Sequence, residues 1–491
     1  MRALSTEGAR FVLSGAQERR MPAANINVVE NASGAPKSVA RIMAVIGRCS
    51  AVSSPAVYSY DTDTTVPDPP AAPPPPELGT AIVRESGQRT LIVPCATSVA
   101  GSLTAVTETP AGTGPAVTVT GTPNDSLSVV IKIVKAGPRG TAKFRVSLDD
   151  GASYGPTLLT TATYLIPKTG ITAAFATGTD YVLDTVYTFD SIAPTPSPAN
   201  IDAAVVALLA SGVKFSMIVV AQTDPAATDT LAMATQLATS LATARTAKRY
   251  LRAIVSSDPD EVDADVVTAF GSITAERVVL ASGDAYISGG SIKGSFRRPA
   301  GWAAAIKCAK NRFSSDLGNG ADGPMPYVAD ITRDEFVETV KLREDARATV
   351  IETRPESSGL FFARGVTLAD PASVYKDLNI ARLIDEACRV CQPLLNQEAN
   401  NDPDLKPNGT IAEAEAERIE AKLLTALENA LINTDDGVKH ASSVSALVDR
   451  TNVIATTEDL RVTISVQKKG QNKTVTATMG ISSTAAPPLA A

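Results

Sequence analysis

The chain has 491 residues, of which 44% are hydrophobic and 4% aromatic, and a formal net charge of −7. Its length predicts about two to four domains, and its acidic balance argues against nucleic acid as the main partner. The sequence has no run near the ~18 apolar residues of a membrane helix, which argues against direct membrane insertion. The first 15 residues lack the apolar core of a signal peptide, so we expect synthesis in the cytoplasm.

The N-terminal part of the chain predicts an arm, a strand and a spacer. Residues 1–30 mix charges with brief apolar runs, and we interpret them as an arm that can pair as a strand but cannot form a core. Residues 38–47 (SVARIMAVIG) predict a buried strand. Residues 66–76 (VPDPPAAPPPP) predict an extended polyproline spacer, because proline fixes φ and lacks a backbone donor.

Residues 78–192 predict an inserted all-β domain, because β-rich segments alternate with Gly, Pro, Asp and Asn turns. Residues 147–151 (SLDDG) predict a turn in which Asp side chains bond the backbone and Gly accepts positive φ. A second proline-rich hinge, 193–198, leads back to the core. The predicted strands are residues 90–93, 116–120, 127–134, 142–148, 160–165 and 186–189.

Residues 31–77 and 193–350 predict a doubly wound α/β core. Between residues 200 and 311, short strands that are apolar throughout alternate with helices, as in a parallel sheet covered on both faces. The predicted strands are 214–220, 250–255 and 276–281, and the predicted helices are 201–209, 228–247, 261–270, 300–310 and the charged segment 333–348.

Residues 351–470 predict a C-terminal α+β domain, followed by a C-terminal arm at 471–491. The helix predicted at 411–431 carries Glu in its first turns and an apolar face that includes Ile419, Leu423 and Leu427. The other predicted elements are strands at 349–352, 359–364 and 460–466 and a helix at 374–397.

No catalytic or cofactor motif is evident. The glycine-rich segment 289–294 contains neither a dinucleotide-binding nor a P-loop pattern. The only histidine, His440, lies between predicted helices, and we expect it at the surface. We therefore predict a protein that is not an enzyme and has no cofactor.

The five cysteines are too few for a disulfide scaffold. Cys388 and Cys391 are spaced like half a zinc site, but no second such pair occurs, so two half-buried helix thiols are favoured over a metal site. An odd number of thiols also permits cross-links between subunits, with Cys95 as the most exposed candidate; the alternative is that all are buried and reduced. The candidate thiols are Cys49, Cys95, Cys308, Cys388 and Cys391.

The order of these pieces resembles the contractile-tail sheath proteins of Mu-like bacteriophages and related injection machines. The resemblance depends on 117–123 (VTVTGTP), 144–151 (FRVSLDDG), 187–189 (YTF), Arg364-Gly365 with 378–390, the long acidic helix and 462–466 (VTISV). It implies a core of subtilisin-like topology without protease activity, an outer inserted domain and an inner C-terminal domain. It also implies stacked hexameric rings around a tail tube protein, baseplate and tail terminator partners, and a virion that is assembled in the host cytoplasm.

By the same resemblance, each arm donates a strand to a neighbouring subunit. The arm strands would include Ile26, Val28 and Val29 in the first arm and Val475, Ala477 and Met479 in the second. The receiving strand would include Val462, Ile464 and Val466. One alternative is an α/β hydrolase-like enzyme with an accessory β module; a tail tube or surface fibre is disfavoured by the α/β core.

Overall fold

A computed structural model of the chain describes residues 42–48, 55–60, 75–112, 114–223, 225, 227–288, 295–338, 341–399, 401–434 and 437–470. The chain divides into residues 1–38 and 39–491, and every described residue lies in the second unit. Both predicted arms therefore lie outside the described residues.

The core is built on a six-stranded sheet with the strand order β15-β14-β13-β1-β3-β2. The first five of these strands run parallel, and β2 joins the edge antiparallel. Every residue of the parallel strands is buried, as expected for a sheet that is covered on both faces. The strands are β1 (Met43–Gly47), β2 (Tyr58–Tyr60), β3 (Thr90–Pro94), β13 (Met217–Val220), β14 (Arg252–Ser256) and β15 (Val278–Ala281).

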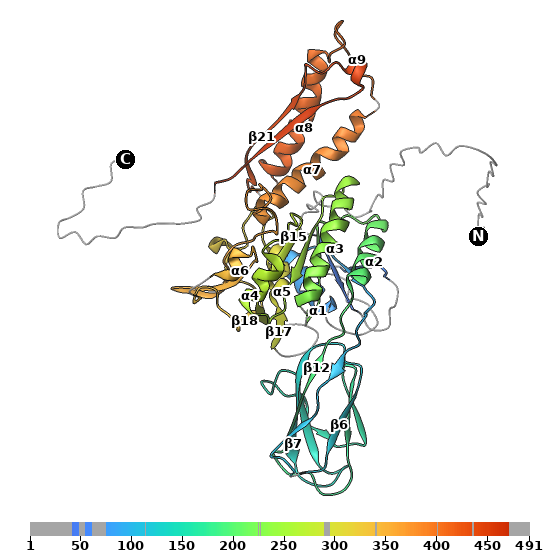
Figure 1. Cartoon of the computed structure of the whole chain (residues 1–491), viewed down its shortest axis with the longest axis vertical. Coiled ribbons are helices and arrows are strands. Elements are labelled where there is room, and N and C mark those ends of the chain that lie inside the picture. The colour runs from blue at the N-terminus through green and yellow to red at the C-terminus, as the bar shows by residue number, and fades with distance from the viewer. Residues whose placement is uncertain are drawn as a thin grey trace, which may run out of the picture. The chain divides into compact units, whose positions relative to one another are not determined.

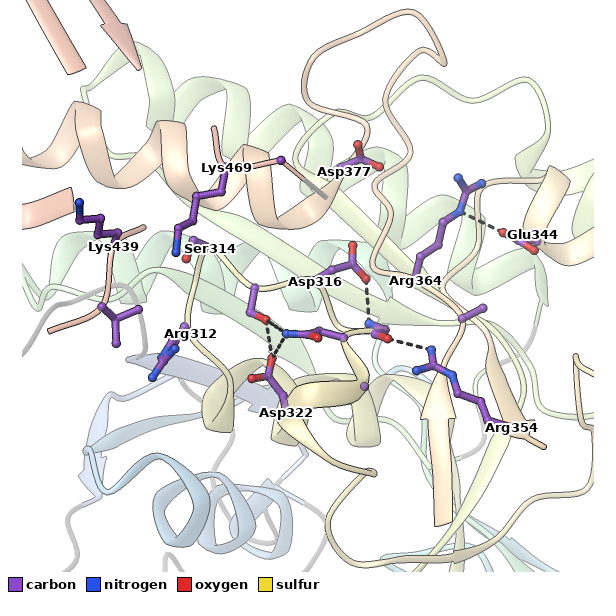
Figure 2. Close-up of a pocket in the computed structure, with 17 residues that line it drawn as sticks. Arg312, Ser314, Asp316, Asp322, Glu344, Arg354, Arg364, Asp377, Lys439 and Lys469 are labelled. Atoms are coloured by element: carbon purple, nitrogen blue, oxygen red, sulfur yellow. Dashed lines mark hydrogen bonds and ion pairs between the residues drawn. The ribbon is translucent and has the colours of Figure 1, made fainter. Parts of the chain in front are cut away.

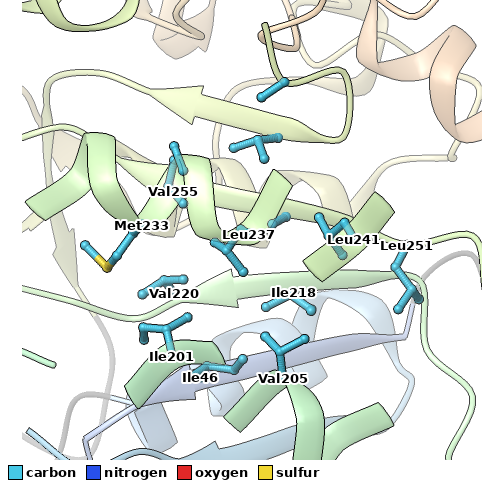
Figure 3. Packing of buried hydrophobic residues seen from close by; sticks show 14 of the residues in the cluster. Ile46, Ile201, Val205, Ile218, Val220, Met233, Leu237, Leu241, Leu251 and Val255 are labelled. Atoms are coloured by element: carbon cyan, nitrogen blue, oxygen red, sulfur yellow. The ribbon is translucent and has the colours of Figure 1, made fainter. Parts of the chain in front are cut away.

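Helices pack on both faces of this sheet (Figure 1). Adjacent residues of one strand point to opposite faces, so Val220 packs under α2 and α3 (Figure 3) whereas Val219 packs toward α1 and α5. Helix α5 lies very close to β14, since a Cβ at Gly301 would stand 2.2 Å from the Ser256 Oγ. The helices are α1 (Pro75–Ser86), α2 (Pro198–Ala210), α3 (Ala227–Thr246), α4 (Asp263–Phe270) and α5 (Ala300–Lys310).

The start of the inserted domain differs from the prediction. The segment 90–93 is part of β3, which lies between β1 and β2 in the core sheet rather than in the β domain. Its continuous apolar run is typical of a strand buried on both faces, and the period-two pattern begins only after it. The proline spacer is also shorter than predicted, because α1 begins at Pro75, where a helix tolerates proline in its first turn.

The inserted domain consists of two antiparallel sheets, β4-β12-β7-β8-β9 with β5 on β12, and β10-β11-β6. Their facing side chains form a separate apolar core that includes Phe144, Phe175 and Tyr187. The 147–151 turn is present, with Asp150 and Gly151 at positive φ. The strands are β4 (Ser102–Leu103), β5 (Thr107–Thr109), β6 (Val117–Gly121), β7 (Leu127–Lys135), β8 (Lys143–Ser147), β9 (Leu158–Leu159), β10 (Thr163–Ile166), β11 (Ile171–Phe175) and β12 (Val186–Ile192).

Strand β17 (Ser295–Pro299) joins the inserted domain to the core. Its Phe296 is part of the β-domain core, and its Arg298, which is fully buried, contacts two carboxylates. The Arg298 guanidinium donates to Asp125 of the inserted domain at 2.9 and 2.7 Å and to Glu77 of α1 at 3.0 Å. The inserted domain is therefore held by a buried ion cluster as well as by its two connecting segments.

The boundary before the C-terminal domain also differs from the prediction. Residues up to Leu368 still pack on the core sheet, because Thr349 and Leu368 bond the backbone of β15. The helix predicted at 333–348 is reduced to α6 (Leu342–Asp345), since its apolar residues are too few to form a buried face. The remaining core elements are β16 (Asp284–Ser288), a 3-10 turn (Gly320–Asp322), β18 (Val328–Asp330), β19 (Ile351–Arg354) and β20 (Ser357–Phe362).

The C-terminal module begins at α7 (Leu378–Glu398) and has its own apolar core with α8 (Glu413–Leu431), β21 (Ala441–Val448) and β22 (Val462–Lys468). A short helix, α9 (Ile454–Thr457), lies between the two strands in the sequence. No helix in the described ranges is long and apolar enough to cross a membrane.

Replacing Arg298 with Met should destabilise the protein by about 3–5 kcal/mol, because two buried carboxylates lose their common cation. Chemical denaturation of the full chain would measure this loss. Lys132→Met is the matched control, since it breaks an exposed pair with Asp184 (3.1 Å) and should cost less than about 1 kcal/mol. Equal losses in the two variants would show that the buried cluster has no special role.

Candidate assembly interface

The C-terminal module presents a two-stranded sheet on a pair of helices. Helix α8 buries Ile419, Leu423, Leu427 and Leu431, which recur every four residues and so face one side. Strands β21 and β22 pair antiparallel, from Ala441 opposite Lys468 to Val448 opposite Val462. The side chains of the sheet's inner face complete the core that α7 and α8 begin.

The predicted receiving residues lie on β22 as neighbours on one face. Val462, Ile464 and Val466 are half-buried and pack toward the helices, whereas Thr463 and Ser465 between them are exposed. Within the described residues each strand pairs only with the other, so each has an outer edge with backbone groups available for a further strand. The predicted arm residues Ile26, Val28, Val29, Val475, Ala477 and Met479 lie outside the described ranges.

Ion pairs hold the helices and the sheet together. Glu398 at the end of α7 pairs with Arg418 (2.6 Å) and Lys422 (2.7 Å) of α8. Hydrogen bonds from Arg418 and Lys422 lower the pKa of Glu398 to about 2, against the opposing effect of its burial. Arg450, which follows β21, pairs with both Glu413 and Glu420 of α8.

A polar cleft of about 780 Å³ lies where the module meets the core (Figure 2). It is lined by the 312–322 loop, by Arg354 and Arg364, and by the residues that precede β21 and follow β22. Three of its carboxylates already have partners. Asp316 accepts from the Gly318 amide (2.8 Å), Asp322 from Asn319 (3.1 Å), and Glu344 pairs with Arg364 (3.1 Å).

A buried lysine supports one wall of this cleft. The Lys307 Nζ donates to the carbonyls of Asp322, Gly323 and Pro324 at 3.2, 2.5 and 3.2 Å. Burial lowers the pKa of Lys307 to about 8. Lys307 belongs to α5, so these hydrogen bonds hold the loop that lines the cleft against this helix.

His440 is buried, so the prediction of a surface histidine is wrong. Its ring stacks on Phe313 with centroids 4.1 Å apart, and its Nδ1 lies 2.7 Å from the Ser314 Oγ. Both partners belong to the loop that follows α5, and His440 immediately precedes β21. The flat ring fills the joint between the core and the C-terminal module, which explains its burial.

The structure places four of the five thiols, and Cys49 lies outside the described residues. Cys95, Cys308 and Cys391 are buried and Cys388 is half-buried. The expectation that Cys95 is the most exposed thiol is wrong, because it follows β3 and packs in the core beneath α2. In the ranges that the structure covers, no three His, Cys, Asp or Glu side chains are grouped so that they could hold a metal.

Sequence reasoning missed β21 and the cleft. Val444, Ala446 and Val448 recur every two residues, but Leu447 interrupts the polar alternation and the serines at 442, 443 and 445 make the segment look like a loop. The cleft has no comparable signal, because its lining residues come from segments that are far apart in the sequence.

Comparison with solved structures defines the class of fold. The chain aligns with a chain from the cryo-EM structure of the anti-feeding prophage baseplate in its contracted state (TM-score 0.51, 11% identity, covering 94% of this chain and 98% of that one). It also aligns with the sheath tail protein of Desulfitobacterium hafniense (TM-score 0.45, 12% identity, covering 90% and 100%). The contracted helical sheath of the anti-feeding prophage gives a TM-score of 0.48 at 11% identity (94% and 99%).

The first of these matches shows that the chain shares its mixed α/β fold with a component of a contractile particle, and it confirms the predicted resemblance at the level of fold. The sequence also matches the family described as DUF2586, N-terminal domain, over residues 21–282. This match spans more than half of the chain, which therefore belongs to that family. A comparison with curated proteins found no match.

The Glu398 network should make the stability of the module depend on pH. The pKa of Glu398 is about 2 in the folded chain and 4.5 without its partners, so its contribution is present above pH 4.5 and is lost as the pH falls toward 2. Between pH 4.5 and pH 2, the free energy of unfolding should fall by about 1 kcal/mol less in Glu398→Gln than in the wild type. Glu417→Gln, an exposed α8 residue without a described ion pair, is the control. Denaturation across this pH range should give parallel curves for the control and wild type; a parallel curve for Glu398→Gln would contradict the assignment.

Proposed function

We propose that this chain is the sheath subunit of a contractile tail or a related injection particle. The observation that carries the proposal is the fold shared over 94% of the chain with a component of a contracted baseplate. Subunits stack as hexameric rings around an inner tail tube, and contraction of the array drives the tube through the host envelope. A head-to-tail contact that does not close generates such a helical array.

The C-terminal module gives the array its connections. The two-stranded sheet β21–β22 is supported by helices and has two outer edges among the described residues, which supports its role as a receiver of strands. In this proposal the arms at 1–30 and 471–491 each donate a strand to a neighbour, and β22 with Val462, Ile464 and Val466 belongs to the receiving sheet.

The remaining modules have complementary roles in the proposal. The inserted β domain faces outward, the C-terminal module faces the tube protein, and the ends of the array meet the baseplate and tail terminator proteins. The core has a subtilisin-like topology without protease function, which the parallel sheet with helices on both faces supports. The particle is a virion tail that is assembled in the host cytoplasm.

An α/β hydrolase-like enzyme is not favoured. The Ser314 and His440 side chains are in contact, but His440 is 6% exposed and its ring stacks on Phe313. Its position explains a packing role at the joint between modules. The proposed subunit therefore acts through its surfaces rather than through an active site.

The purified chain should form hollow tubes or rings by negative-stain electron microscopy, and deletion of residues 1–30 or 471–491 should abolish them. Either truncation should leave a soluble subunit with an unchanged unfolding transition, because residues 42–470 supply every apolar core that the structure describes. Wild-type protein that remains a monomer would argue against the sheath proposal. Normal tubes from both truncated chains would instead show that donated strands do not connect the subunits.

A further inference from the structure

One end of the polar cleft carries positive charge that the described residues do not balance. Arg312, Lys439 and Lys469 come from three separate segments, are all exposed, and gather at the same end in Figure 2. None of the three forms an ion pair within the part of the chain that the structure describes. Of the carboxylates that line the cleft, Glu344 pairs with Arg364, Asp316 and Asp322 accept hydrogen bonds from the Gly318 amide and from Asn319, and Asp377 is buried. This end of the cleft therefore suits a segment with several carboxylates.

The far end of the C-terminal module carries the opposite charge. Asp402 and Asp404 lie in the loop between α7 and α8, and Glu458 follows α9; all three are exposed and form no ion pair in the described ranges. The neighbouring cations are engaged, since Lys406 and Arg450 both pair with Glu413. Leu405 is 40% exposed beside the two aspartates and adds an apolar contact to the same loop.

The two charged ends cannot meet within one molecule. The cleft lies at the end of the sheet where Ala441 pairs with Lys468, and the acidic loop lies at the end where Val448 pairs with Val462. Arg450, which follows β21, pairs with Glu413 at the start of α8, so the second end lies beside the first turn of this helix. Helix α8 has 19 residues and is therefore about 28 Å long, and it runs from this end back toward the cleft. The described residues of one molecule therefore do not bring the two charged ends together, whereas a second copy of the chain offers each end a surface of opposite charge.

We propose that the acidic loop 401–405 of one copy docks into the cationic end of the cleft of a second copy. This inference rests on the proposed function and names one contact of the array. The two surfaces differ, so the contact is head to tail and propagates from copy to copy. Opposite charges at the two ends of one module steer association and fix which ends meet, and salt screens them because they are exposed.

Charge exchange tests this contact in the full-length chain. Lys439→Glu with Lys469→Glu, or Asp402→Lys with Asp404→Lys, should raise the concentration needed for tube formation by roughly tenfold, because attraction becomes repulsion at each contact. The chain with all four substitutions should recover tube formation, and so should an equimolar mixture of the two double variants. Lys135→Glu with Lys143→Glu, at exposed positions on the inserted domain, makes the same change in net charge as the lysine double variant and is its matched control.

Thermal unfolding of each variant, compared with wild type, shows whether the subunit itself is intact, and pelleting across a salt series measures the contact. Tubes that form normally in both double variants would overturn this inference and leave the sheath proposal standing. Loss of tubes that neither the fourfold variant nor the mixture restores would overturn it as well. Wild-type chains that form no tubes would count against the proposed function itself.

Discussion

The arrangement of this chain depends on two buried ion clusters whose charges do not balance. At the first, the Arg298 guanidinium lies between Asp125 and Glu77, and burial raises the pKa of Glu77 against the opposing effect of Arg298. At the second, Asp385 of α7 lies between Arg252 (2.7 Å) and Arg277 (3.3 Å) of the core sheet. One cluster joins the inserted domain to the core, and the other joins the C-terminal module to it.

These clusters give the modules a fixed geometry that apolar contacts alone do not provide. Each module has its own apolar core, and hydrophobic burial is non-directional. A buried guanidinium, in contrast, stabilises only the relative placement of two modules in which every carboxylate lies within hydrogen-bond distance of its N–H groups. Other placements are disfavoured because an unpaired buried charge is very costly. Arg252 adds a bond to the Ala381 carbonyl (3.1 Å), so that α7 is fixed through its backbone as well. Such rigid joints suit the proposed role, in which each copy contacts several neighbours in register.

The sequence alone predicted the positions of helices where the hydrophobic periodicity agreed with local signals such as caps and prolines. Helix α5 lies at the predicted residues, and α2 begins where Ser197 and Asn200 form a reciprocal cap after a proline-rich hinge. The segment 90–93 was assigned to the wrong sheet, because a short apolar run shows that a strand is buried but not which strands it pairs with.

The contacts between modules and the cleft could not be predicted from the sequence, because they bring together residues that are far apart in the chain. Arg298 and Asp125 are 173 residues apart, and no spacing rule connects them. His440 looked exposed for the same reason, since its stacking partner Phe313 lies far away in the sequence. The open edges of β21–β22 could be anticipated only in part, because β21 is rich in serine and gives a weak strand signal.

Strand β17 has a consequence for the order in which the chain acquires structure during synthesis. The inserted domain is complete at β12, yet Phe296 of its core and the cation for Asp125 belong to a strand that begins at Ser295. At roughly 5–20 residues per second, a ribosome needs on the order of five to twenty seconds to pass from Ile192, the end of β12, to Arg298. During that interval the nascent β domain holds an unneutralised carboxylate and an open site for one aromatic ring. The core of the inserted domain is therefore completed only after β17 of the core has been translated.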